Sequence, residues 1–224
     1  MNAKFKLIAL ALVITLFNCK KAEKEKTLDE FKFSEKGIVL DCDKFDVKLL
    51  NEALFSFEND ITKFYGKDNP NKTRVFSQFI NNSIYGRIKY TDIVSPHTVK
   101  IFEVLKSKKD LWNLDNTTSK LNYNSTLFSC IMNNISDKDL KTTLSALVST
   151  NSMSPKLFNP AIKSNYSIAT RDKYLSAYLA LDAFYAKLFD VDLTQITEKP
   201  EQKVDFNKVP ASTSDNNSHA GHDH

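Results

Sequence analysis

The last six residues carry the densest group of metal-binding side chains in the sequence. They read His219-Ala-Gly-His222-Asp-His224, so three imidazoles and the Asp223 carboxylate lie close together. Imidazole nitrogen is a good ligand for Zn and Cu, and short histidine-rich tracts commonly bind metals. Because Gly221 allows the chain to bend, these side chains can converge on one ion. The sequence therefore predicts a Zn or Cu site here, and the alternative is a solvated end that binds nothing.

One histidine lies outside this tail. His97 follows Ser95-Pro96, a pair that is typical of a helix start, so we expect it in a first helical turn and exposed to solvent. A histidine that acts as a general base needs a partner that orients it, and the sequence identifies none. We therefore interpret His97 as structural.

The N-terminus has the pattern of an export signal. Lys4 and Lys6 precede an apolar run over residues 7–17. A charged start followed by such a short apolar stretch is typical of a secretory signal. A membrane-spanning helix needs about 20 apolar residues, so this run is too short to cross a bilayer.

The apolar run ends at a cysteine. Leu16 lies three residues before Cys19, and Asn18 precedes the cysteine directly. This arrangement resembles the lipobox of bacterial lipoproteins, in the looser form that is similar to that of the Bacteroidota. The resemblance implies that a signal peptide, 1–18, is removed and that Cys19 carries acyl chains such as palmitate. It places the protein on a membrane of the cell envelope, facing the periplasm or the cell surface.

Two further cysteines leave two interpretations open. Cys42 and Cys130 would lie in an oxidising compartment, where an even number of thiols predicts a disulfide. Such a bridge would close a long loop and stabilise the fold by about 4 kcal/mol in the chain-entropy model. However, Cys130 lies in an apolar stretch and would also serve as a small buried side chain. The sequence slightly favours two free thiols.

Composition excludes several function classes. Removing Lys4 and Lys6 from the 31 basic residues leaves 29 against 27 acidic ones, so the mature chain is nearly neutral. Arginine is scarce and no basic stripe occurs, which argues against nucleic-acid binding. With four glycines in the whole chain, a glycine-rich phosphate-binding loop is also excluded.

Apolar residues recur every three or four positions through most of the chain, which is typical of amphipathic helices. The pattern predicts an all-α domain over 38–192, a compact bundle of about six helices. We expect 36–42 to be extended, and 107–123 and 150–169 to be connections. The charged segment 19–37 and the polar segment 193–224 should be a disordered tether and a disordered tail. The predicted helices span 44–65, 72–90, 96–106, 125–134, 137–149 and 170–189.

The last predicted helix carries a stripe of tyrosines. Tyr174, Tyr178 and Tyr185 fall on one side of it. Tyrosine combines an apolar body with a polar tip, so such a stripe can line a ligand cleft. Aromatic residues at helical spacing belong more often to a core, and we predict that these do too.

These observations favour a non-enzymatic envelope lipoprotein, held at a membrane by its lipid anchor. Its helical domain would bind an envelope protein or a small ligand. One alternative is a metal-handling lipoprotein that captures Zn or Cu through His219, His222, Asp223 and His224. A second alternative is an enzyme built on carboxylates without a recognisable motif.

Overall fold

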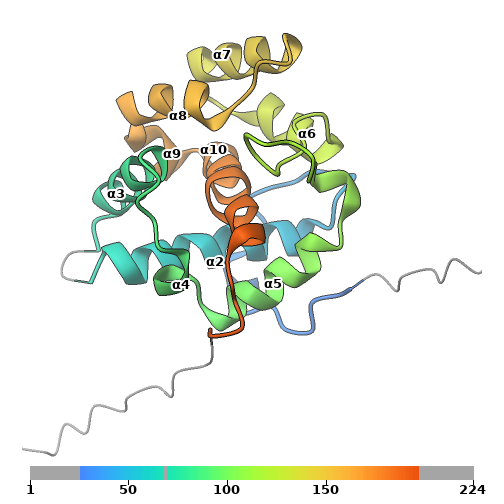
Figure 1. Cartoon of the computed structure of the whole chain (residues 1–224), viewed down its shortest axis with the longest axis vertical. Helices are drawn as coiled ribbons and strands as arrows, with labels where there is room; N and C mark the ends of the chain where they lie inside the picture. The colour runs from blue at the N-terminus through green and yellow to red at the C-terminus, as the bar shows by residue number, and fades with distance from the viewer. Residues whose placement is uncertain (1–25, 68–69, 197–224) are drawn as a thin grey trace, which may run out of the picture.

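The protein is described by a computed structural model that covers residues 26–67 and 70–196. Within these residues the chain forms nine α-helices and no β-strand (Figure 1), which confirms the predicted all-α class. The α-helices are α2 (Val47–Tyr65), α3 (Lys72–Ile84), α4 (Tyr90–Ile93), α5 (Pro96–Lys106), α6 (Thr126–Asn134), α7 (Lys138–Ser149), α8 (Pro155–Ser164), α9 (Tyr166–Arg171) and α10 (Lys173–Tyr178).

Short turns of other helical types complete the fold. Two 3-10 turns, η1 (Ser34–Lys36) and η2 (Lys109–Leu111), lie in the N-terminal segment and after α5. Two more turns continue α10 without a break. They are the π-helical η3 (Leu179–Phe184) and the 3-10 helical η4 (Tyr185–Asp190).

The prediction of about six helices was too low because three short helices were missed. The stretch 150–169, expected to be a connection, forms α8 and most of α9. Pro155 is tolerated at the first turn of α8 because its missing N–H would be unpaired there anyway. The apolar face of α8 buries Phe158 and Ile162, which favours the helix despite Pro160 inside it.

The helix predicted over 72–90 ends early, at Ile84. Gly86 adopts a positive φ of 62°, a conformation that a glycine enters without steric cost, and α3 ends just before it. The chain then turns and forms α4 as a separate single turn.

The stretch predicted as one helix over 170–189 is the centre of the molecule. Figure 1 shows α10 and the turns after it in the middle of the other helices. Every side chain from residue 175 to residue 186 is buried. A helix that is apolar on all sides must be surrounded by other elements. Asp172 caps α10, and its carboxylate accepts hydrogen bonds from the backbone N–H groups of Tyr174 and Leu175 at 3.0 Å.

The predicted disordered tether is ordered in its described part. Leu28 packs against the core, and the backbone N–H groups of Lys32 and Phe33 donate hydrogen bonds to Glu52 of α2. Isolated apolar residues among charges have no helical period. Their burial depends on partners far along the chain, which the local pattern does not reveal.

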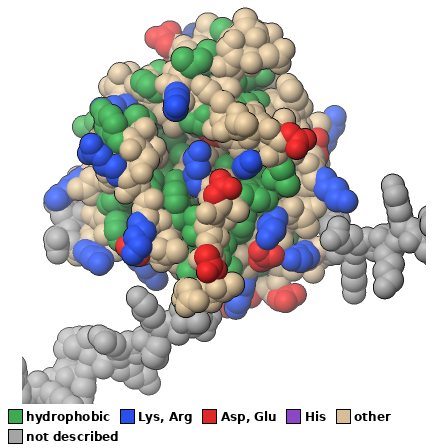
Figure 2. Space-filling model, viewed as in Figure 1, with side chains coloured by type: hydrophobic (Ala, Val, Ile, Leu, Met, Phe, Trp, Pro, Cys, Tyr) green, Lys and Arg blue, Asp and Glu red, His purple; other side chains and the backbone are tan. Residues whose placement is uncertain are grey.

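The other end of the domain also extends past its predicted limit. Leu193 and Ile196, assigned to the disordered tail, pack against the core. The ordered domain is therefore wider than 38–192 on both sides. Figure 2 shows one face of it, where basic and acidic side chains are interspersed with hydrophobic ones, in line with the small net charge.

The buried leucines of α2 provide a test of the core. Leu54 is 1% exposed, whereas Leu157 of α8 is 56% exposed. We expect Leu54→Ala to lower the free energy of unfolding by about 2–5 kcal/mol, because it leaves a cavity. The matched change Leu157→Ala should stay within about 0.5 kcal/mol of the parent. Urea unfolding followed by circular dichroism measures both, and equal effects would contradict this core.

Candidate functional site

A sizeable cavity lies where the ends of three helices meet. Its volume is about 590 Å³, and its walls come from the start of α2, the end of α5, η2 and the start of α6. Pockets that bind small ligands typically measure about 300–1,000 Å³. The cavity is therefore large enough for a small-molecule ligand. We call it the lysine cleft.

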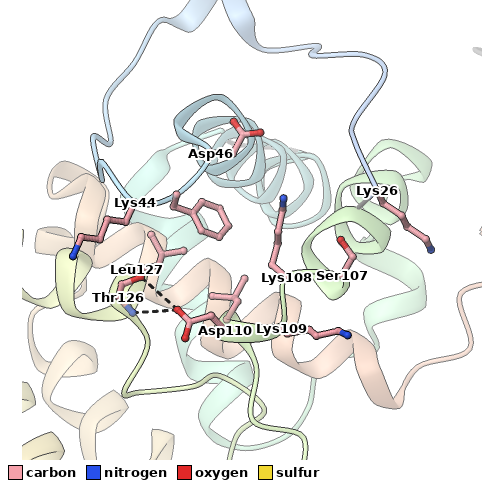
Figure 3. A pocket seen from close by; sticks show the side chains of 11 residues that line it. Lys26, Lys44, Asp46, Ser107, Lys108, Lys109, Asp110, Thr126 and Leu127 are labelled. Atoms are coloured by element: carbon pink, nitrogen blue, oxygen red, sulfur yellow. Dashed lines mark hydrogen bonds between the residues drawn. The ribbon is translucent and has the colours of Figure 1, made fainter. Parts of the chain in front are cut away.

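Lysines dominate the charged lining of the lysine cleft. Four lysines and two aspartates line it, and Figure 3 shows them, with the amino ends of Lys26 and Lys44 directed outward to opposite sides. Three apolar side chains also line it, so an anionic group and an apolar body could both find contacts. The charged residues are Lys26, Lys44, Lys108, Lys109, Asp46 and Asp110, and the apolar ones are Phe45, Leu111 and Leu127.

Both aspartates of the lysine cleft are already engaged with helix starts. The Asp46 carboxylate accepts a hydrogen bond from the backbone N–H of Leu49 at 3.0 Å and caps α2. The Asp110 carboxylate accepts from the backbone and the hydroxyl of Thr126, both at 3.4 Å, at the start of α6. The positive ends of two helix dipoles thus offset part of the acidic charge.

His97 does not lie where the sequence predicted it. It is 5% exposed, and its Nε2 lies 2.6 Å from Oε1 of Glu52. The expected position in the first turn of a helix is right, but this turn packs on α2, and the His97 ring meets the ring of Phe33 edge to face. The expectations that His97 is exposed and lacks a partner are therefore wrong.

Glu52 connects three parts of the chain. Its carboxylate accepts hydrogen bonds from the backbone N–H groups of Lys32 at 2.6 Å and Phe33 at 3.1 Å, in addition to the contact with His97. Nδ1 of His97 is buried and has no partner among the described residues. The arrangement fastens the N-terminal segment across α2 and α5, which supports the structural interpretation of His97.

Asp182 forms a deeply buried polar cluster. It lies in the π-helical turn η3 and is 0% exposed. The hydroxyls of Ser119, Tyr123 and Tyr178 donate hydrogen bonds to its carboxylate, the two tyrosines at 3.0 and 2.9 Å. Burial raises the pKa of Asp182, and these hydrogen bonds act in the opposite direction.

Asp60 forms a smaller cluster of the same kind between α2 and α5. Its carboxylate accepts hydrogen bonds from the hydroxyl of Thr98 at 2.6 Å and from the backbone N–H of Ser95 at 2.9 Å. Burial raises the pKa of Asp60. These hydrogen bonds hold the start of α5 on α2, so this carboxylate has a structural role.

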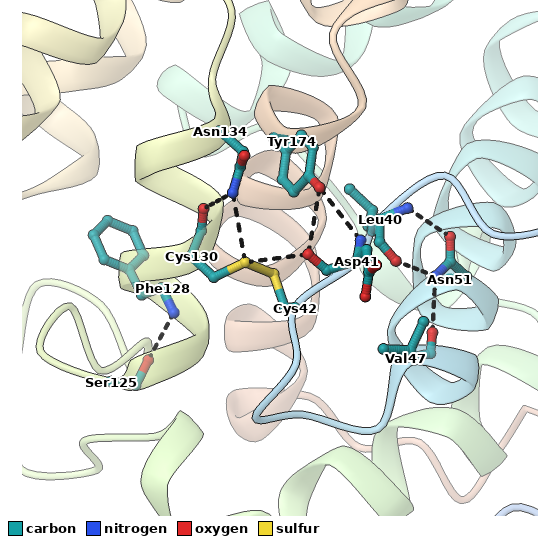
Figure 4. Close-up of a disulfide and its surroundings, with 10 residues drawn as sticks. All are labelled: Leu40, Asp41, Cys42, Val47, Asn51, Ser125, Phe128, Cys130, Asn134 and Tyr174. Carbon is teal, nitrogen blue, oxygen red and sulfur yellow. Dashed lines mark hydrogen bonds between the residues drawn. A yellow bond between two sulfur atoms is a disulfide. The ribbon is translucent and has the colours of Figure 1, made fainter.

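The tyrosine stripe belongs to the core. Tyr178 and Tyr185 are fully buried, and their hydroxyls donate to Asp182 and to the carbonyl oxygen of Ala53. Tyr174 is only partly buried, and it contacts the backbone of Asp41 (Figure 4). For Tyr178 and Tyr185 the predicted core role is confirmed.

Cys42 and Cys130 form a disulfide, which Figure 4 shows between the segment before α2 and helix α6. Their Cα atoms are 5.9 Å apart, within the usual range for a bridge. The slight preference for free thiols was therefore wrong. Residue spacing alone does not reveal that α6 folds back onto the segment that contains Cys42.

The remaining predicted site residues lie outside the described residues. These are Cys19 and the tail residues His219, His222, Asp223 and His224, so acylation and Zn or Cu binding stay predictions. Among the described residues, no three His, Cys, Asp or Glu side chains gather in a way that could hold a metal ion. Within the same residues, no helix has the length and apolarity to cross a bilayer.

The Glu52 cluster can be tested by substitution. Glu52→Ala removes the acceptor for two backbone N–H groups and for His97. We expect it to lower the free energy of unfolding by about 2–3 kcal/mol, because each donor left unpaired in the interior is costly. Glu35→Ala, an exposed change in η1 of the same segment, is the control and should have little effect. Urea unfolding measures the free energy of unfolding of both variants, and equal stability would refute this role of Glu52.

The disulfide predicts a thiol count. In the full chain with Cys19→Ser, we expect no reactive thiol after denaturation without reductant, and two after reduction. The bridge spans 88 residues, which corresponds to about 4–5 kcal/mol in the chain-entropy model. The further change of both Cys42 and Cys130 to Ser should therefore lower the thermal midpoint clearly. Two thiols before reduction would show that the bridge is absent.

Comparison of the chain with protein-family models, with curated proteins and with solved structures found no match.

Proposed function

We propose that the chain is a lipid-anchored protein of the bacterial cell envelope and that its helical domain binds a small amphipathic anion in the lysine cleft. The cavity of about 590 Å³ with four lysines in its walls is the observation that carries this proposal. The function is one of binding rather than of catalysis.

The chemistry of the lysine cleft favours an anion with an apolar part. Lysine ammonium groups attract a carboxylate, sulfonate or phosphate group as point charges. Phe45, Leu111 and Leu127 offer apolar surface to the rest of the ligand. A purely ionic ligand would leave this surface unused, and a neutral ligand would not use the lysines.

The proposed anchor would keep the lysine cleft near the membrane. Lys26 lines the lysine cleft and forms an ion pair with Glu103 at 2.9 Å. It lies seven residues after Cys19, and seven extended residues span at most about 25 Å. A ligand that leaves or enters the lipid surface would therefore meet the lysine cleft within a short distance.

Binding is favoured over catalysis because the acidic groups of the lysine cleft and the buried titratable groups named here already form hydrogen bonds within the fold. Asp46 and Asp110 of the lysine cleft each accept hydrogen bonds at a helix start. The buried groups His97, Asp60 and Asp182 hold segments of the fold together. A catalytic acid or base must instead be directed at the reacting atom of a substrate.

Acylation is tested at Cys19. In cells given an alkyne analogue of palmitate, the parent chain should be labelled and should fractionate with membranes. Cys19→Ala should lose the label, because the acyl chains need the thiol. Cys42→Ala provides a matched cysteine control that should stay labelled. Labelling of the Cys19→Ala chain would contradict the anchor.

Ligand binding is tested with an amphipathic anion, 8-anilinonaphthalene-1-sulfonate, by fluorescence titration. We expect saturable binding to the native protein that Lys44→Glu weakens about fivefold, which corresponds to about 1 kcal/mol, the upper range for an exposed ion pair. Lys156→Glu makes the same charge change on the exposed side of α8 and should leave affinity unchanged. Equal affinities of both variants would place binding outside the lysine cleft.

A further inference from the structure

A second cavity has a different chemistry from the lysine cleft. It measures about 210 Å³ and lies between the loop 113–124 and the turn that joins α7 to α8. We call it the asparagine pocket, because five of its nine lining residues are asparagines. They are Asn113, Asn116, Asn122, Asn124 and Asn151.

Two of these asparagines shape the loop. The amide of Asn122 donates to the carbonyl oxygen of Asp110 at 2.8 Å, and its Oδ1 accepts from the backbone N–H of Asn124 at 3.0 Å. Oδ1 of Asn116 accepts from the backbone N–H and the hydroxyl of Thr118, both at 2.9 Å. The wall of the pocket is therefore held in place before any ligand arrives.

The other three asparagines have side chains that are available to a ligand. Within the part of the chain that the structure describes, the side-chain amides of Asn113, Asn124 and Asn151 form no hydrogen bond. Asn151 has a positive φ of 53°, so its backbone is fixed in a turn that few residues adopt. Three amides thus border the pocket with both their donor and acceptor groups unused.

Tyr123 gives the pocket a rigid wall. It is 9% exposed, and its hydroxyl donates to the buried carboxylate of Asp182 at 3.0 Å. Its ring contacts Phe128 edge to face, with the ring centroids 5.2 Å apart. Burial raises the pKa of Tyr123 above its ordinary value, so the phenol stays neutral.

No charged side chain lines the asparagine pocket. Leu121 and Met153 also line it but are buried, so the surface that a ligand meets is mostly polar. An amide offers two N–H donors and a carbonyl acceptor, and a hydroxyl group can both donate and accept. A ligand rich in hydroxyl groups matches this lining. At about 30 Å³ for each water molecule, the volume corresponds to about seven waters, which suits one small ring.

We propose that the asparagine pocket binds a single neutral hexose ring. The amides of Asn113, Asn124 and Asn151 contact its hydroxyls. This site is separate from the lysine cleft and does not depend on the anion proposed there. Because the ligand is small, its dissociation constant should lie in the millimolar range.

The test uses the mature full chain in a detergent without sugar groups, and saturation-transfer NMR with D-glucose, D-galactose and D-mannose. At least one neutral hexose should bind saturably and more tightly than D-glucuronate and D-glucosamine, which carry a charge. Asn124→Ala should weaken this binding about three- to tenfold through the loss of one polar contact. Asn151→Gly should do the same, since glycine keeps the positive φ while the amide is lost.

Two controls separate this site from other effects. Asn133→Ala removes an exposed asparagine of α6 and should leave hexose affinity unchanged. Lys44→Glu should weaken binding of the anilinonaphthalene probe but not of the hexose, so the two proposals can fail independently. Absence of saturable hexose binding, unchanged affinity in both Asn124→Ala and Asn151→Gly, or tighter binding of the charged sugars would overturn the proposal.

Discussion

The structure depends on the burial of one carboxylate in the middle of its core. Asp182 lies in the central stretch formed by α10, η3 and η4, where every neighbouring side chain is buried. A carboxylate without partners would be strongly unfavourable there. Donors from Ser119, Tyr123 and Tyr178 make the position acceptable. A π-helical turn places this residue, and such turns are rare and often occur where a helix must present a particular side chain.

Buried carboxylates with hydrogen-bond donors around them also connect the outer parts of the fold. Glu52 fastens the N-terminal segment and α5 to α2, and Asp60 holds the start of α5 on the same helix. Each of these carboxylates links segments that are remote in sequence, and the disulfide adds a covalent link of the same kind between Cys42 and Cys130. Buried polar groups therefore determine which elements lie together, while apolar burial supplies most of the favourable free energy.

Both proposed binding sites lie at the margins of this core rather than within it. The lysine cleft is bordered by the starts of α2 and α6, and the asparagine pocket by the loop 113–124. Tyr123 belongs to both the pocket wall and the Asp182 cluster, so the rigid core positions the loop. Loops held by a rigid scaffold are common places for binding sites.

The sequence by itself determined the features that depend on near neighbours. Apolar steps of three and four residues located α2, α5 and α6, and Ser95 caps α5 as its position before Pro96 predicted. Only the tertiary structure decided the features that depend on distant residues. His97 meets Glu52 across 45 residues, and Cys130 meets Cys42 across 88. A helix forms from contacts within a few residues, whereas burial, pairing and cavities arise only when elements far apart in the chain pack together.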